Sequence, residues 1–245
     1  SKKTIDINFR ISLLKNLKKE IELNEKDIEN ALNNDLGKSS GESYLTEIAF
    51  VYFEIKIALK NIKKWVKRKP VRSSLLNFPS SDYIIAEPYG NTLHISPWNY
   101  PFQLAIAPLI GAVAAGNTVL LKPSEYSVNT SKILNKILSS VFDDGFVKVV
   151  QGGPEIASEI LKFKWDYIFF TGSVSVGKIV AKEAAKNLTP VTLELGGKNP
   201  CVIDKTASLK VTAKRIVWGK FTNCGQTCIA PDFLIVDNKI KSKLI

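Results

Sequence analysis

The first seventy residues carry apolar side chains every three or four positions. This spacing places them on one buried face of a helix. We expect three helices before Pro70: one over residues 11–21, one capped by Asn24 and ended by Gly37, and a longer one whose apolar face runs over residues 44–62. The chain therefore opens with an N-terminal helical segment.

The pattern then changes to short β-like runs. Residues 83–86 and 92–95 are rich in apolar and β-branched side chains, and Pro88 and Gly90 lie between them. Two such runs around a turn favour a hairpin, which we expect over residues 82–96.

Beyond residue 100 the chain alternates between helical and strand patterns. The expected helices cover residues 101–115, 128–141, 154–162 and 175–187. The strands that follow them cover residues 118–121, 147–150, 166–170 and 191–195. Strict alternation indicates parallel βαβ units with helices on both faces. The fold class is therefore α/β, with a doubly wound, mainly parallel, Rossmann-like sheet.

Composition excludes several classes of protein. Hydrophobic residues make up 45% and charged residues 23% of 245, as in a globular chain. The longest apolar run, 101–115, contains Pro108 and is too short to span a membrane. The polar N-terminus does not look like a signal peptide, and three cysteines are typical of a reducing compartment, so we expect a cytoplasmic protein. His94 is the only histidine, and the cysteines lack the paired spacing of zinc ligands, so we expect no metal site.

The net charge of +11 is concentrated most densely over residues 60–69, where six of ten residues are basic. Such a patch could bind nucleic acid or an anionic membrane. It could equally end a helix, where cations meet the negative end of the helix dipole. No nucleic-acid motif accompanies the patch, so we favour the helix end and expect neither nucleic acid nor a membrane as a partner.

In a parallel sheet, ligands bind beyond the carboxyl ends of the strands. After one expected strand, Gly172, Ser173 and Gly177 begin a helix whose free amides could hold a phosphate. The spacing nearly matches a P-loop, but Ile179 follows Lys178 where a P-loop needs Ser or Thr for magnesium. These glycines could also serve only to start and pack a helix.

Three side chains outside this glycine turn suggest nucleophilic catalysis. Cys228 could act as a nucleophile, whereas Cys201 fits a small buried hydrophobe and Cys224 a neighbour of Cys228. Glu194 ends an apolar strand, where burial would raise its pKa toward the range of a general base. Asn99 could donate its amide to an oxyanion or could be an ordinary turn residue.

Five segments occur in an order and spacing that match a known family. They are Ser96–Phe102, Ala115–Glu125, Phe170–Gly177, Leu193–Lys198 and Gly225–Cys228. Together they resemble the NAD(P)-dependent aldehyde dehydrogenases, and most of all the class 3 or fatty-aldehyde branch. The resemblance covers essentially the whole chain and favours a dinucleotide over a P-loop ligand.

The resemblance implies that an aldehyde is oxidised to a carboxylic acid with NAD or NADP. Cys228 would attack the aldehyde, Asn99 and the Cys228 amide would hold the oxyanion, and Glu194 would activate the hydrolytic water.

The resemblance also implies a set of cofactor-binding residues. Lys122 and Glu125 would bind the adenosine ribose, and Trp98 would lie along the cofactor. The turn Gly172–Gly177, with Ser173, would bind the pyrophosphate.

By the same resemblance, residues 1–193 form the cofactor-binding domain, and residues 194–245 begin an α/β catalytic domain that is truncated here. The 82–96 hairpin would be an oligomerisation element of a homodimer. Family members continue well past the nucleophile, so we expect little turnover from the 245 residues alone. A non-catalytic NAD-binding module is the alternative.

Overall fold

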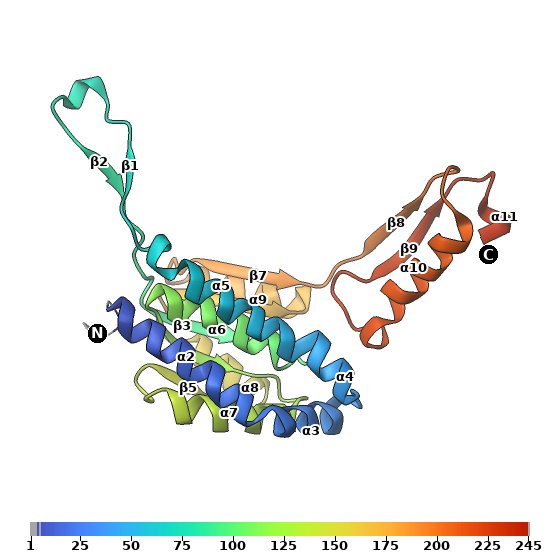
Figure 1. Cartoon of the computed structure of the whole chain (residues 1–245), viewed down its shortest axis with the longest axis horizontal. Helices are drawn as coiled ribbons and strands as arrows, with labels where there is room; N and C mark the ends of the chain where they lie inside the picture. The colour runs from blue at the N-terminus through green and yellow to red at the C-terminus, as the bar shows by residue number, and fades with distance from the viewer. Residues whose placement is uncertain (1–3, 5, 245) are drawn as a thin grey trace.

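The computed structural model describes residue 4 and residues 6–244. A layered body of helices and a sheet lies at the centre, and two smaller pieces project from it (Figure 1). One piece is a hairpin of β1 (Lys69–Val71) and β2 (Asp82–Ile84). The other is the C-terminal segment that begins with β8 (Asn199–Ile203).

The N-terminal helical segment forms as predicted. It consists of α2 (Ile7–Leu23), α3 (Glu25–Leu36), the single turn α4 (Ser40–Ser43) and α5 (Ala49–Trp65). Gly37 ends α3 at φ 67°, a left-handed conformation that glycine adopts freely. Asn24 is the N-cap residue of α3, as predicted, but its side chain makes no capping hydrogen bond and instead donates to the Glu20 carbonyl at the end of α2.

A π-helical turn, Tyr44–Ile48, interrupts the long helix expected over residues 44–62. A π turn adds a residue to the helical repeat and so rotates the side chains that precede it. Tyr44 and Leu45 are consequently exposed, although the pattern placed them on the apolar face, and Glu47 is completely buried.

Five parallel strands form the central sheet, which confirms the predicted fold class. Their order across the sheet is β5-β4-β3-β6-β7. The strands are β3 (Asn91–Ile95), β4 (Thr118–Lys122), β5 (Val147–Val149), β6 (Tyr167–Gly172) and β7 (Val191–Leu195). The chain winds one way from β3 to β5 and the other way from β6 to β7.

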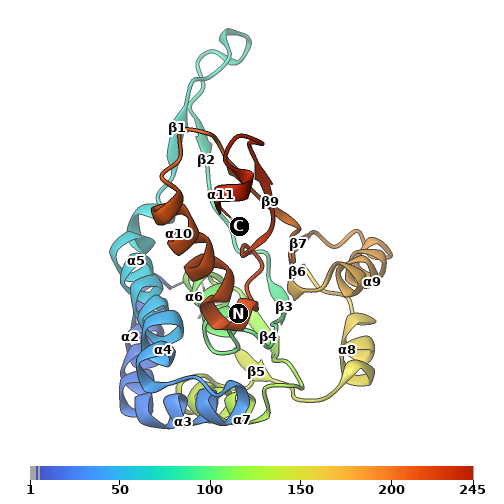
Figure 2. The same cartoon turned by 90° about the vertical axis from the view of Figure 1, so that its right-hand side faces the viewer.

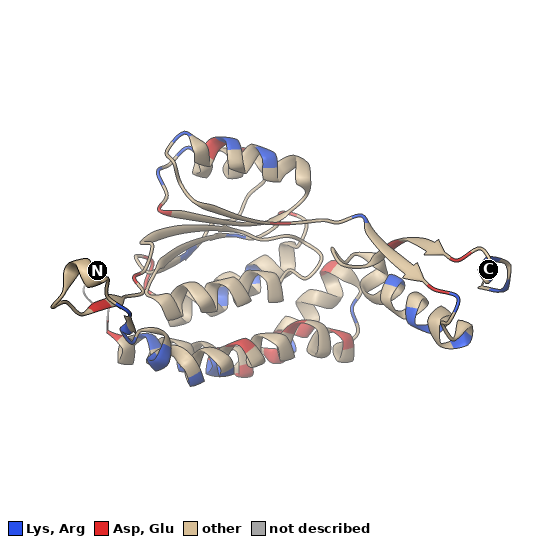
Figure 3. Cartoon of the chain, turned by 90° about the horizontal axis from the view of Figure 1, so that it is seen from above, with Lys and Arg blue, Asp and Glu red and all other residues tan. Residues whose placement is uncertain are grey.

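Helices cover both faces of this sheet (Figure 3). On one face, α6 (Gln103–Ala115) and α7 (Val128–Val141) share a large core with the N-terminal helices. On the other face, α8 (Pro154–Leu161) and α9 (Val174–Ala185) pack in a smaller core. The opposite faces follow from the right-handed connections of the two halves. No helix of the described residues is long and apolar enough to cross a membrane.

The hairpin expected over residues 82–96 is wrong. β2 pairs with β1, and β3 lies at the centre of the parallel sheet between β4 and β6. Residues 92–95 are buried on both sides, so their apolar run belongs to a central strand. The observed hairpin carries an exposed apolar tip of Leu75, Leu76 and Phe78.

After β7 the C-terminal segment extends away from the sheet (Figure 1), and in the view from that end α10 (Leu209–Phe221) and β9 (Pro231–Val236) lie in front of the sheet (Figure 2). β8 pairs in parallel with β9, and α10 lies between them in the chain. A short 3-10 turn, Thr222–Gly225, follows α10, and α11 (Lys241–Leu244) comes after β9. Cys201, expected to be buried, is half-buried on β8.

Candidate active site

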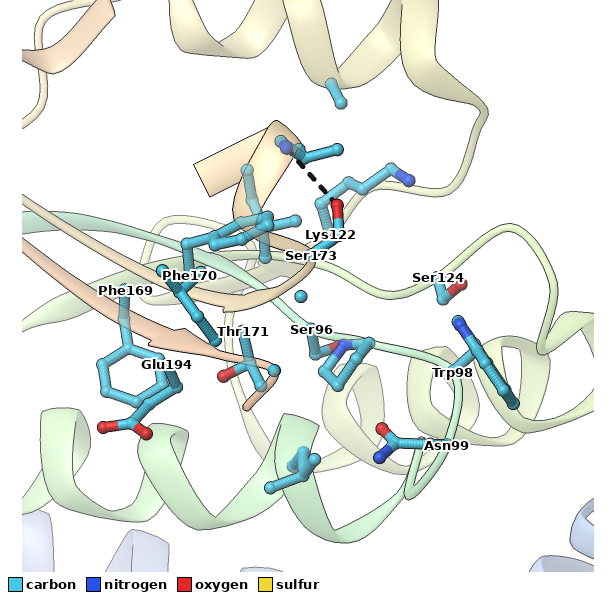
Figure 4. Close-up of a pocket in the computed structure, with 18 of the residues that line it drawn as sticks. Ser96, Trp98, Asn99, Lys122, Ser124, Phe169, Phe170, Thr171, Ser173 and Glu194 are labelled. Carbon is cyan, nitrogen blue, oxygen red and sulfur yellow. Dashed lines mark hydrogen bonds between the residues drawn. The ribbon is translucent and has the colours of Figure 1, made fainter. Parts of the chain in front are cut away.

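A cleft of about 850 Å³ opens at the carboxyl ends of β3, β4, β6 and β7 (Figure 4). The winding direction reverses between β3 and β6, so this position is the switch point at which doubly wound folds bind ligands. The volume lies in the range of small-molecule and cofactor sites.

Eight of the nine predicted site residues line this cleft: Trp98, Asn99, Lys122, Glu125, Gly172, Ser173, Glu194 and Cys228. Gly177 is not among them. It is buried on α9, where a Cβ atom would lie 2.7 Å from Cδ2 of Leu195. Gly177 therefore packs the helix against β7, and its part in binding the pyrophosphate stays a prediction.

Cys228 lies on the loop that leads from α10 to β9. Asn223, Cys224 and Gly225 precede it with φ values of 53°, 56° and 77°. Left-handed backbone at two residues other than glycine is uncommon and is found most often at functional sites. The turn leaves Cys228 exposed, and Asn199 holds its carbonyl with a hydrogen bond of 2.7 Å.

The loop that carries Asn99 clasps the loop that carries Cys228. The Asn99 side-chain nitrogen donates to the Gln226 carbonyl at 2.8 Å, and the Asn223 side chain donates to the Asn99 carbonyl at 2.9 Å. The hydroxyls of Tyr100 and Thr227 are 2.9 Å apart. We call these three hydrogen bonds the loop clasp. An amide nitrogen carries two donors, so Asn99 can bind Gln226 and an oxyanion together.

Glu194 lies near the end of β7, opposite Thr171 of β6. It is exposed, so the burial expected for this carboxylate is wrong. Figure 4 shows its side chain beside Phe169 at the cleft wall. An exposed carboxylate in a cleft has direct access to water.

Lys122 and Glu125 form an ion pair at the end of β4, with 2.7 Å between Nζ and Oε2. The Lys122 side chain is only 3% exposed, whereas that of Glu125 is 31% exposed. Burial alone would raise the pKa of Glu125, but the hydrogen bond and charge of Lys122 outweigh it and lower that pKa. Glu125 therefore presents a negative charge to the cleft.

The N-terminus of α9 faces the same cleft. Ser173 is the N-cap, and its hydroxyl accepts the Val176 N–H at 3.3 Å. A Cβ atom on Gly172 would lie 2.6 Å from Cζ of Phe170, so the backbone here approaches that ring closely. Free amides at a helix start suit a phosphate ligand.

Sequence reasoning missed the residues that hold the site together. Asn199, Asn223 and Gln226 fix the Cys228 loop, and a buried pair, Lys38 and Glu47, lies behind Asn99. The asparagines lie within or beside the motifs quoted above, but nothing in the pattern indicates their partners. Within the described residues, no group of three or more potential metal ligands comes together.

The fold and cleft define a doubly wound α/β protein whose ligand site combines a helix N-terminus, a carboxylate and an exposed thiol. The chain belongs to the aldehyde dehydrogenase family, whose model matches residues 2–245. This match confirms the family resemblance.

Three curated relatives show which aldehyde dehydrogenases the chain is similar to. The chain is 49% identical over 245 residues to 4,4'-diaponeurosporen-aldehyde dehydrogenase of Staphylococcus aureus, covering all of this chain and 53% of that protein. It is 48% identical to aldehyde dehydrogenase family 3 member A2 of Macaca fascicularis, covering 98% and 49%. It is 46% identical to the dimeric NADP-preferring aldehyde dehydrogenase of Rattus norvegicus, covering 100% and 54%.

A solved structure described as the substrate-bound state of Staphylococcus aureus AldH superposes with a TM-score of 0.95 at 49% identity. The match covers 98% of this chain and 52% of that one. The chain thus spans about half the length of the relatives it matches.

Proposed function

We propose that this chain provides the dinucleotide site and the nucleophile of an enzyme that oxidises an aldehyde to a carboxylic acid with NAD or NADP. One observation carries the proposal: the loop clasp holds Asn99 and Cys228 at one cleft, which Glu194 and the α9 N-terminus also line. Family membership supports the same activity.

The first step forms a bond between the Cys228 sulfur and the aldehyde carbon. The carbonyl oxygen becomes an oxyanion, to which the free side-chain donor of Asn99 and the Cys228 backbone amide would donate. When bound, the nicotinamide ring supplies the acceptor for the hydride that leaves this carbon, so the adduct becomes a thioester.

The second step is hydrolysis of that thioester. Glu194 would take a proton from water while the water oxygen attacks the thioester carbon. The carbon–sulfur bond then breaks, the carboxylic acid leaves, and Cys228 returns as thiolate. The exposure of Glu194 suits this role because its water must come from solvent.

The residues present fit a dinucleotide. The α9 N-terminus, with Gly172 and Ser173, would hold the pyrophosphate, and Lys122 and Glu125 would hold the adenosine ribose. Trp98 lies at the rim of the same cleft and is partly exposed. A relative named as dimeric and NADP-preferring supports both a dinucleotide cofactor and a homodimer.

An aldehyde-oxidising enzyme and a non-catalytic NAD-binding module differ in whether an aldehyde adds to the Cys228 thiol. The rate at which iodoacetamide alkylates Cys228 measures this difference. An enzyme site adds an aldehyde to the thiol, so hexanal should slow alkylation of Cys228 and leave Cys201 unaffected. A non-catalytic module would bind NAD⁺ in calorimetry without such protection. If hexanal does not slow the alkylation of Cys228, the proposed function is contradicted.

Turnover by these 245 residues alone is expected to be low. The chain spans about half of its relatives, and catalysis needs a geometry that is fixed on all sides of the substrate. Rapid aldehyde-dependent formation of NADH by the purified chain would contradict this expectation.

A further inference from the structure

A buried ion pair lies behind the cleft, outside the residues assigned above. The Nζ atom of Lys38 is 2.5 Å from Oε1 of Glu47, and the two side chains are 2% and 0% exposed. Removing two charges from water costs several kcal/mol for each, and this cost is offset only when every donor and acceptor is paired. Both charged groups therefore need hydrogen-bond partners besides each other.

Glu47 contacts the start of α6. Its Oε2 atom accepts the backbone N–H groups of Phe102 at 2.8 Å and Gln103 at 3.1 Å. Glu47 lies within the π-helical turn and is completely buried. Glu47 therefore fixes where α6 begins, immediately after the loop of Asn99.

Lys38 contacts that loop itself. Its Nζ atom donates to the backbone carbonyl of Asn99 at 3.2 Å and lies 4.3 Å from the centre of the Tyr100 ring. With Glu47 as the third partner, these contacts account for the three donors of the ammonium group.

Asn99 and Tyr100 are also the residues that form the loop clasp. The Asn99 carbonyl accepts from both Lys38 and Asn223, and Tyr100 contacts both Lys38 and Thr227. The Lys38 ammonium group and the Cys228 loop thus meet at the same backbone carbonyl of Asn99. The contacts run without a break from Glu47 through Lys38 and Asn99 to the Cys228 loop.

We propose that Lys38, held by Glu47, is a positioning residue that fixes Asn99 and the Cys228 loop relative to each other. The inference rests on the proposed function, since it concerns the oxyanion donor and the nucleophile of that reaction. The lysine acts through Asn99 and touches no substrate.

A carboxylate can cap the start of a helix without a buried lysine beside it, so the cap of α6 by Glu47 does not explain Lys38. Asp35 caps the start of α7 in a comparable way, with its carboxylate accepting four hydrogen bonds from Asn129 and Thr130. Asp35 also belongs to the N-terminal helical segment, but these hydrogen bonds do not connect it with the residues of the loop clasp. It provides a matched control.

The test compares three variants of the full 245-residue chain by hydrogen–deuterium exchange. Lys38→Met removes the cation. Lys38→Met/Glu47→Gln removes both charges but keeps an acceptor for the α6 amides, so it remains informative if the single variant fails to fold. Asp35→Asn weakens the cap of α7.

Both Lys38 variants should speed exchange in residues 222–230 by about tenfold or more, because the clasp opens locally. Asp35→Asn should speed exchange at the start of α7 and leave residues 222–230 within about twofold of the parent. Unchanged exchange in residues 222–230 in the Lys38 variants, or equal acceleration by Asp35→Asn, would overturn the proposal.

A second readout connects positioning to chemistry. The hexanal concentration that halves alkylation of Cys228 should rise in both Lys38 variants and stay unchanged in Asp35→Asn; an unchanged value in the Lys38 variants counts against positioning. If the parent chain shows no aldehyde protection, the proposed function fails. The exchange measurement needs no aldehyde, so it separately decides whether Lys38 fixes the loops.

Discussion

The side-chain amide of Asn99 donates a 2.8 Å hydrogen bond to the backbone carbonyl of Gln226, which lies 127 positions later in the chain. This bond joins the loop after β3 to the loop after α10. It brings Asn99, the proposed oxyanion donor, and Cys228 to one cleft, although the two loops belong to different sheets.

Asn99→Ala should weaken aldehyde capture. A hydrogen bond to a charged group contributes about 1.5–3 kcal/mol, so the hexanal concentration that half-protects Cys228 should rise by roughly tenfold to a hundredfold. Protection of Cys228 from iodoacetamide measures this. The affinity for NAD⁺ serves as the control, since Asn99 is assigned no part in binding the dinucleotide; an unchanged protection curve would remove Asn99 from the oxyanion site.

Glu125→Gln should shift cofactor preference toward NADP⁺. The lowered pKa of Glu125 keeps it ionised in the cleft, where it would repel the additional phosphate of NADP⁺. Removing this charge at short range is expected to change the ratio of the two dissociation constants by about tenfold. Calorimetric titrations measure the ratio, and Glu183→Gln, at a surface ion pair of α9, is the matched control.

The stability of the chain should fall between pH 6.5 and pH 4 because of His94. Burial lowers the pKa of His94 from 6.5 to about 4. The unfolded chain therefore takes up a proton in this range before the folded chain does, so stability is present above pH 6.5 and is lost as the pH falls. The total loss should be about 3 kcal/mol.

Urea unfolding at pH 7 and pH 5 measures this loss. His94 is the only histidine of the sequence, so a His94→Gln variant should flatten the dependence over that interval. Equal pH dependence in the parent and the variant would show that His94 does not cause it.

Two glycine substitutions should change stability with opposite sign. Gly177→Ala places a Cβ atom 2.7 Å from Cδ2 of Leu195, and the overpacking cost of about 1–3 kcal/mol should exceed the gain of about 1 kcal/mol in helix propensity, leaving a small net loss of stability. Gly111 on α6 has no atom within 4 Å of an added Cβ, so Gly111→Ala should stabilise by about 0.5–1 kcal/mol through helix propensity. Urea unfolding of both variants measures the two signs, and destabilisation by Gly111→Ala would contradict the packing described.

The sheet and most of the cleft could be predicted because they depend on local patterns. Alternating helices and strands placed Lys122, Gly172 and Glu194 at strand ends, which meet at one edge of a parallel sheet. The expected hairpin failed because the buried run at residues 92–95 looks alike in a hairpin and in a central strand. Only the pairing of β3 with β4 and β6 distinguishes them.

The contacts that orient the site could not be predicted. The burial of Glu47 depends on its contacts with Lys38 and with the backbone of Phe102, which no apolar period signals. The exposure of Glu194 depends on what covers the end of β7, and the strand pattern around it suggested a buried position. Both are decided by partners distant in sequence.

The hydrogen bonds between the two loops have a consequence for how the protein loses its chemistry. The backbone reaches the C-terminal segment through a short glycine-containing stretch at residues 196–198, so chain connectivity does little to keep the thiol near the sheet. Mild heating or a low concentration of denaturant is therefore expected to move the thiol away from the cleft while the strands of the central sheet stay paired. The proposed reaction would then be lost at a lower temperature than the one at which the sheet unfolds.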